Sequence, residues 1–110
     1  MAYTEIDDPS AYFQTTLYTG NGGTLAVTNG GNSDLQQDWT WIKERSQTES
    51  HFLFDTVRGD NKYMNSNGTG IEYTESGGMA FGTNKFTLGN WGSVNNNGST
   101  FASWNWKAGT

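Results

Sequence analysis

Residues 100–109 read TFASWNWKAG, and this stretch decides the fold. Large rings alternate with small or polar residues, as they also do in residues 38–45, which read DWTWIKER. Alternation with period two is typical of a strand that buries one face. The two stretches carry four of the five tryptophans, and we expect these four indoles to meet between two stacked sheets. The sequence therefore predicts a β-sandwich closed by its last strand.

The composition favours a single domain whose core is built from rings. A chain of 110 residues is long enough to bury a core. It has sixteen aromatic residues against eleven Ile, Leu and Val. Gly, Asn, Ser and Thr account for 51 residues, which suits short strands joined by tight turns. No apolar period of 3.6 residues persists, so we expect no long helix.

Period two and turn residues place the expected strands. Besides the two tryptophan stretches, strands are predicted over residues 11–19, 24–28, 51–57, 62–64, 71–73, 79–81 and 85–88. The strand at 51–57 is apolar on both faces, which indicates a central position. Asn21-Gly22-Gly23 predicts a hairpin-type turn, and Gly82-Thr83-Asn84 predicts a hairpin. Residues 89–99 form a Gly- and Asn-rich loop, and residues 1–10 form an arm.

Charge and cysteine content exclude several classes of function. The net charge is −5 without any basic stripe, which argues against binding to nucleic acid. No segment approaches the roughly 20 apolar residues that a membrane-spanning helix needs, so we expect no membrane insertion. The chain has no cysteine, which removes disulfides and cysteine nucleophiles.

The titratable residues do not predict catalysis. His51 is the only histidine and stands beside Phe52 in a strand, where a packed strand residue explains it better than a catalytic base. A retaining glycosidase needs two carboxyl groups about 5 Å apart across a cleft. Glu72 and Glu75 are three residues apart, a spacing that points to opposite faces of a strand, and Asp55 and Glu44 lie on other strands. We therefore expect no enzyme and no cofactor.

Other acidic and short motifs have structural explanations. Two groups of acids carry oxygens that suit calcium: Glu5, Asp7 and Asp8 form one, and Asp34 with Asp38 forms the other. Helix caps and turns account for these acids more simply, so no metal site is expected. Residues 58–60 read Arg-Gly-Asp, which matches an integrin-binding tripeptide. We expect Arg58 instead to pair with a carboxylate such as Asp55, a contribution below about 1 kcal/mol if exposed.

Several strings in a fixed order carry a family resemblance, and they lie at residues 6–15, 18–22, 38–46, 51–59, 62–67, 86–89, 94–95 and 104–109. As a set they resemble the module of tail-fibre and other virion proteins of marine bacteriophages, especially those that infect cyanobacteria and abundant ocean bacteria. The resemblance implies a concanavalin A-like jelly-roll sandwich over residues 11–110, preceded by the arm at 1–10. It leaves open whether the chain is a single module or the N-terminal part of a longer fibre.

The resemblance also implies a function. The expected protein is a non-enzymatic virion component, made in the host cytoplasm, that serves as a tail-fibre or neck/tail-appendage module and presents loops to the host. Its expected partners are other virion proteins and further copies of itself, with a trimer by analogy. One alternative is a carbohydrate-binding module that recognises a host surface glycan. A further alternative is a capsid decoration protein.

Two candidate surfaces come from the residues themselves. Exposed rings beside amides are suited to sugars, and the residues that fit are Trp91, Asn95, Asn96 and Asn97, followed by Tyr63 and Tyr73. The alternative is that Trp91 folds over one end of the sandwich as a plug. The arm carries apolar groups that need a docking partner, and its expected attachment residues are Tyr3, Ile6, Pro9 and Tyr12.

Overall fold

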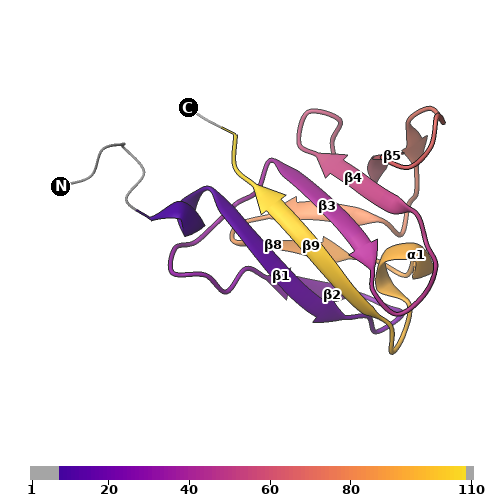
Figure 1. Cartoon of the computed structure of the whole chain (residues 1–110), viewed down its shortest axis with the longest axis horizontal. Coiled ribbons are helices and arrows are strands. Elements are labelled where there is room, and N and C mark those ends of the chain that lie inside the picture. The colour runs from indigo at the N-terminus through magenta and orange to yellow at the C-terminus, as the bar shows by residue number, and fades with distance from the viewer. Residues whose placement is uncertain (1–7, 109–110) are drawn as a thin grey trace.

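The computed structural model describes residues 8–108, and it confirms the expected antiparallel β-sandwich (Figure 1). A short 3-10 helix, η1 (Pro9–Ala11), precedes the strands. The strands are β1 (Phe13–Thr19), β2 (Leu25–Thr28), β3 (Trp39–Glu44), β4 (His51–Asp55), β5 (Lys62–Asn65), β6 (Tyr73–Thr74), β7 (Met79–Gly82), β8 (Lys85–Leu88) and β9 (Thr100–Trp106). One helical turn, α1 (Gly92–Asn95), lies between β8 and β9.

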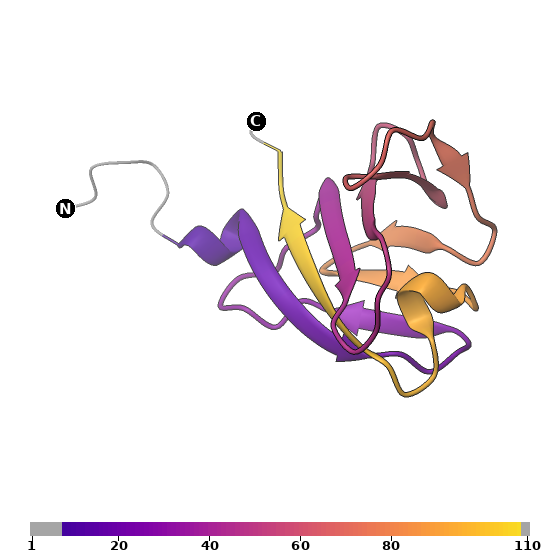
Figure 2. The ribbon, with the colours of Figure 1, turned by 45° about the vertical axis from the view of Figure 1, so that its right-hand side comes forward.

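The two sheets differ in size, and the chain winds between them. The larger sheet has the order β1-β9-β3-β4-β5-β6, and the smaller has the order β2-β8-β7. The first strand pairs with the last and the second with the next to last, in opposite sheets, as in a jelly roll. Figure 2 shows the smaller sheet as a second layer against the long strands β1, β9 and β3. β4 lies between β3 and β5, which confirms its predicted central position.

The first predicted hairpin is wrong, whereas the second is confirmed. Residues 21–23 do turn the chain, because Gly22 has a φ of +72° and the Asn21 side chain accepts a hydrogen bond from the Gly23 N–H. The turn nevertheless joins β1 and β2, which lie in different sheets. Local turn chemistry specifies a reversal but not the sheet that the next strand enters. β7 and β8 pair directly around Thr83 and Asn84.

One part of the interior is a conventional hydrophobic core. Inward side chains of the larger sheet meet those of the smaller sheet, and most of them are completely buried. The core residues are Val27, Ile42, Phe52, Phe54, Met79, Phe86, Leu88, Val94 and Phe101. Four of the nine are phenylalanines, and each buried ring removes a large area from water.

The interior continues into a polar network at the other end of β1, β3 and β9. Asn105 is its centre: its side-chain amide donates to the Gln14 carbonyl at 3.2 Å and its oxygen accepts from the Thr40 hydroxyl at 3.0 Å. Asn29 accepts from the Thr16 hydroxyl at 3.0 Å and donates to the buried Gln37 side chain at 3.1 Å. Buried polar groups of this kind are tolerated because they satisfy one another, and within residues 8–108 only Gln37 Nε2 is buried without a hydrogen-bond partner.

Tyr18 links the core to α1 and makes alkaline pH a test of the fold. Its hydroxyl donates to the Val94 carbonyl at 2.8 Å. Burial, with a smaller effect of the nearby Glu44 carboxylate, raises the pKa of Tyr18 well above its usual value of 10.0. The folded state therefore holds the phenol proton more tightly than the unfolded state does. This contribution to stability is complete below pH 10 and is lost as the pH rises toward the folded pKa.

We expect Tyr18→Phe to flatten the alkaline loss of stability. At neutral pH the variant loses a hydrogen bond, which costs about 1 kcal/mol. Above about pH 10 the difference between the two proteins should shrink, because only the wild type has a phenol to ionise at this position. Urea unfolding at neutral and alkaline pH measures both quantities. A constant difference across that range would contradict the buried position of the phenol.

The start of the described chain is docked rather than free. Asp8 caps η1 by accepting from the Ser10 N–H at 3.0 Å, and its other oxygen accepts from the Ser33 hydroxyl. Hydrogen bonds from Ser33, followed by those from Ser10, lower the pKa of Asp8 below its usual value. Asp8, Pro9 and Ser10 therefore belong to the body of the domain, although the sequence predicts them in the arm.

Candidate functional site

The outer side of the larger sheet carries five aromatic rings, which we call the aromatic face: Phe13, Trp39, Trp41, Trp104 and Trp106. Burial alternates along β3, where Thr40 and Ile42 are buried and the flanking tryptophans are not. The four indoles do meet, because β3 pairs with β9. They meet outside the sandwich, however, so the prediction that they lie between the sheets is wrong.

Strand register sets the rings of the aromatic face in two cross-strand rows. In the first row Trp106 lies between Phe13 and Trp39, with ring centroids 5.0 and 4.4 Å away. In the second row Trp104 lies beside Trp41 at 5.7 Å. Phe13 and Trp39 are each 38% exposed, while the other three rings are half-buried because neighbouring rings shield them. The result is a continuous apolar surface in contact with solvent.

His51 holds one edge of the aromatic face in place. The Trp41 indole N–H donates to His51 Nδ1 at 3.0 Å, and the two rings meet edge to face. A neutral imidazole that accepts at Nδ1 carries its proton on Nε2. His51 is therefore a half-buried strand residue that orients a neighbouring indole.

Three of the sequence-predicted sugar residues form a second ring cluster. Tyr63 stacks on Tyr73 at 5.5 Å and contacts Trp91 at 4.6 Å, and Trp91 meets Phe52 edge to face at 4.9 Å. Tyr73 is 43% exposed, but Trp91 is half-buried against the core. Burial, followed by the nearby Glu75 carboxylate, raises the pKa of Tyr63. The arrangement matches the alternative in which Trp91 plugs one end of the sandwich.

The three asparagines predicted with Trp91 differ in exposure. Asn95 is completely buried and ties the turn after β1 to α1 by donating to Asn21 and Gly23 and by accepting from the Asn21 N–H. Asn96 is exposed and donates to the Ser99 hydroxyl at 2.8 Å, and Asn97 is exposed. Asn95 therefore has a structural role, which leaves only the other two amides accessible.

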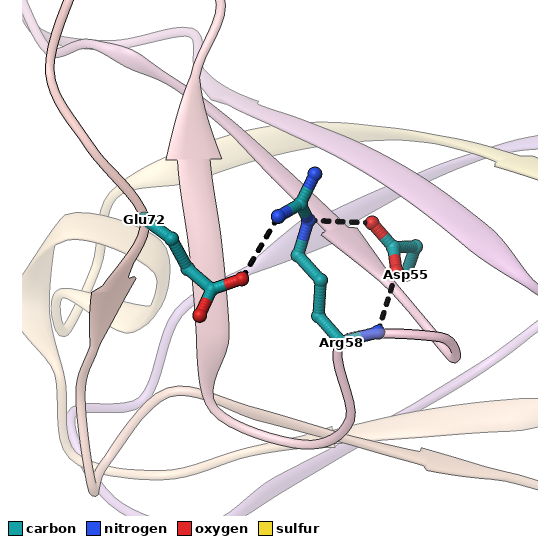
Figure 3. A network of polar contacts seen from close by, with 3 residues as sticks. All are labelled: Asp55, Arg58 and Glu72. Carbon is teal, nitrogen blue, oxygen red and sulfur yellow. Dashed lines mark hydrogen bonds and ion pairs between the residues drawn. The ribbon is translucent and has the colours of Figure 1, made fainter.

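Arg58 joins two carboxylates at the end of β4 (Figure 3). Its side chain donates to Asp55 and to Glu72, in both cases at 2.8 Å, and its backbone N–H also donates to Asp55. The hydrogen bond to Glu72, together with the charges of both acids, raises the pKa of Arg58. The predicted pairing with Asp55 is confirmed. Asp60 accepts from the Phe81 N–H, so both ends of the Arg-Gly-Asp tripeptide have structural contacts.

Two other acids, Asp38 and Glu44, have roles in the fold. Asp38 accepts from the Ala108 N–H at 2.9 Å and from the Thr56 hydroxyl at 3.3 Å. Glu44 is buried and accepts from Ser46. Within residues 8–108, no three or more histidine and acidic side chains gather where they could hold a metal ion. Glu5 and Asp7 lie outside the described residues.

A comparison with protein families identifies the family to which the chain belongs. The family model for "Domain of unknown function (DUF7483)" matches residues 8–110, which is almost the whole sequence. The chain belongs to this family. No curated protein and no solved structure matches it.

The DUF7483 match begins at Asp8, where the described structure also begins. Pro9 and Tyr12, two of the predicted attachment residues, are exposed at the start of this domain, and Tyr12 is 37% exposed. The other two, Tyr3 and Ile6, lie outside the described residues. Among residues 8–108 no helix is long and apolar enough to cross a membrane.

The aromatic face of the DUF7483 domain could not be identified from local signals alone. The alternation in β3 and β9 marks one face of each strand as ring-bearing, but it does not say whether that face is inside or outside. The faces of β3 and β9 that do not carry the rings held a clue. Their residues Thr40, Ser103 and Asn105 are too polar for an ordinary core unless they form hydrogen bonds with other buried groups. Their partners Gln14 and Asn29 come from distant segments.

Proposed function

We propose that this domain is a non-enzymatic module of a phage tail fibre or neck/tail appendage and that it works through its contact surfaces. The resemblance of its sequence strings to marine phage virion proteins supports the location. The observation that carries the contact role is the aromatic face. Five large rings lie on the outer side of a sheet whose inner side includes buried amides and hydroxyls.

This distribution has a physical consequence. Contiguous exposed apolar patches are uncommon on soluble monomers and usually mark a binding surface. Rings on a sheet face stabilise the fold only as far as they are removed from water, and Trp39 on this face is still 38% exposed. A surface of this kind becomes favourable once a ligand or partner covers it, which supports a role in attachment.

The arrangement of acids also supports a role without catalysis. A retaining glycosidase needs two carboxyl groups facing each other across a cleft, and the candidates here are Asp55 at the end of β4 and Glu72 just before β6. Arg58, however, bonds to both and occupies the space where a glycosidic bond would need to lie. Among the described residues, the His51 side chain has one hydrogen bond, which its Nδ1 accepts from Trp41.

The location in the particle is tested with an antibody raised against the purified domain. On particles from an infected culture, gold-labelled antibody should mark tails or necks. Labelling of heads alone would support a decoration protein, and unlabelled particles would contradict a virion role. Light scattering on the purified chain gives the oligomer number, for which analogy predicts three chains of 12.1 kDa.

Attachment through the N-terminal segment gives a separate prediction. Deletion of residues 1–7 should leave the domain folded, because the hydrogen bonds of Asp8 to Ser10 and Ser33 remain. The truncated protein should fail to enter particles when it is supplied in place of the full chain. Far-UV circular dichroism and protein gels of purified particles measure the two outcomes. Normal incorporation would contradict attachment through this segment.

A further inference from the structure

The aromatic face is hollowed at two adjoining places. The first hollow, of about 190 Å³, is lined by Trp41, Trp104 and Trp106 alone. The second, of about 450 Å³, has Trp39 and Trp106 as its rings. Trp106 borders both hollows, and we call the two together the depression. The second hollow falls within the size range of small-molecule sites.

The second hollow adds polar groups to the rings. Its lining includes the Asp38 carboxylate, the Thr56 hydroxyl and the exposed Lys107. Lys107 supplies a donor, and Thr56 and Asp38 supply hydroxyl and carboxylate oxygens. Val57 and Ala108 complete the border. The depression thus has an aromatic floor throughout and hydrogen-bonding groups at one end.

The walls of the depression are fixed before any ligand arrives. Trp39 and Trp106 stack with an interplanar angle of 22°, and the hydrogen bond to His51 orients Trp41. Asp38 is held by three contacts: its N–H donates to the Trp106 carbonyl at 2.8 Å, and its carboxylate accepts from Thr56 and Ala108. A preformed site of this kind loses little conformational entropy on binding.

No hydrogen bond within residues 8–108 uses the indole N–H of Trp39, Trp104 or Trp106. Each is a donor that a ligand hydroxyl could take. An apolar ligand would leave these donors without a partner if it covered them, which costs free energy. The occupant must therefore combine an apolar face with hydroxyl groups around its edge.

We propose that the two hollows bind a neutral oligosaccharide, with neighbouring sugar units stacked on the indoles on either side of Trp106. The C–H face of a pyranose ring is apolar and its hydroxyls project around the rim, which is the pattern that these walls require. The hollows carry one acid and one base, and the chain has a net charge of −5, so nothing here favours an anionic glycan. This inference rests on the proposed attachment function and names its ligand.

A second protein copy fits the depression less well than a sugar does. Nine residues line the two hollows, whereas a stable protein interface uses roughly 20–30 residues a side. The concave shape also suits a small ligand better than a flat self-complementary contact.

The test uses the purified chain and a panel of neutral oligosaccharides of two to six units, with glucose-, mannose-, galactose- and N-acetylglucosamine-based members. Binding to at least one series should change the tryptophan fluorescence, and calorimetry should give its affinity. Trp106→Ala removes the shared wall and should weaken binding at least tenfold, whereas Trp106→Phe should retain part of it. Leu17→Ala is the matched control, because Leu17 is 59% exposed on the same side of the sheet and lines neither hollow.

Three results would overturn the inference: no binding to any series, unchanged binding by Trp106→Ala while its circular dichroism is native, or an oligomer that Trp106→Ala converts to monomers. The last result would assign the aromatic face to a contact between chains. Antibody labelling of tails together with an absence of sugar binding would leave the proposed function standing and remove only this site. Sugar binding by a chain that is absent from particles would support this site and contradict the proposed location in the virion.

Discussion

Phe54→Ala is expected to lower the free energy of unfolding by about 3–5 kcal/mol, the usual cost of removing a buried ring. Phe54 is completely buried in β4, and its ring lies 5.9 Å from that of Tyr63. The substitution removes apolar contact and leaves a cavity that the surrounding strands cannot fill. Because domains of this size have about 5–15 kcal/mol in total, the variant should be marginally folded. Urea unfolding followed by circular dichroism measures the change.

Phe13→Ala is the matched control for that measurement. It makes the same chemical change in the same sheet, but on a ring that is 38% exposed on the aromatic face. We expect a loss of about 1 kcal/mol, because the ring is only partly removed from water. Equal losses in the two variants would mean that the inner and outer faces of the larger sheet have been assigned incorrectly.

Asn105→Leu is expected to cost about 3 kcal/mol although leucine is more hydrophobic and similar in size. Asn105 bonds to the Gln14 carbonyl and to the Thr40 hydroxyl, and it contacts the Asn29 side-chain oxygen at 3.4 Å. The substitution removes these hydrogen bonds and leaves the buried Thr40 hydroxyl without its acceptor, and each buried group that loses its partner costs about 1–3 kcal/mol. The same unfolding experiment measures the effect.

Asn97→Leu provides the comparison for the polar network. Asn97 lies exposed in the loop before β9, and its replacement should change stability by less than about 0.5 kcal/mol. A stabilised Asn105→Leu protein would show that the interior around β1, β3 and β9 is apolar and that the indoles, rather than the amides, face inward.

Much of the secondary structure could be predicted from the chain alone. Alternation of rings with small residues located β3 and β9, whereas the ring-rich composition predicted only part of the core, in which four of nine side chains are aromatic. Asn-Gly and Gly-Thr-Asn turns marked the ends of strands, although the chain after Asn21 crosses to the other sheet. These features depend on residues close in sequence, where side-chain period and turn chemistry act directly.

The candidate site was less predictable than the fold. Trp91 sits in a loop, which made it the obvious exposed ring, yet Phe52 and Tyr63 from two strands partly cover it. The rings of β3 and β9 looked like core because indoles are the most costly side chains to leave in water. Their exposure depends on amides and hydroxyls elsewhere that make the opposite faces of the same strands suitable for burial.

The order of amino acids alone determined that this chain forms an antiparallel sandwich, because its period-two segments are short, rich in rings and separated by turn residues. Only the tertiary structure decided which side of the larger sheet faces solvent. A strand presents two faces, and the residues of the strand alone do not determine which face is buried. The choice follows from partners contributed by distant segments, since Gln14 and Asn29 satisfy Asn105 inside while Phe13 extends the indole surface outside.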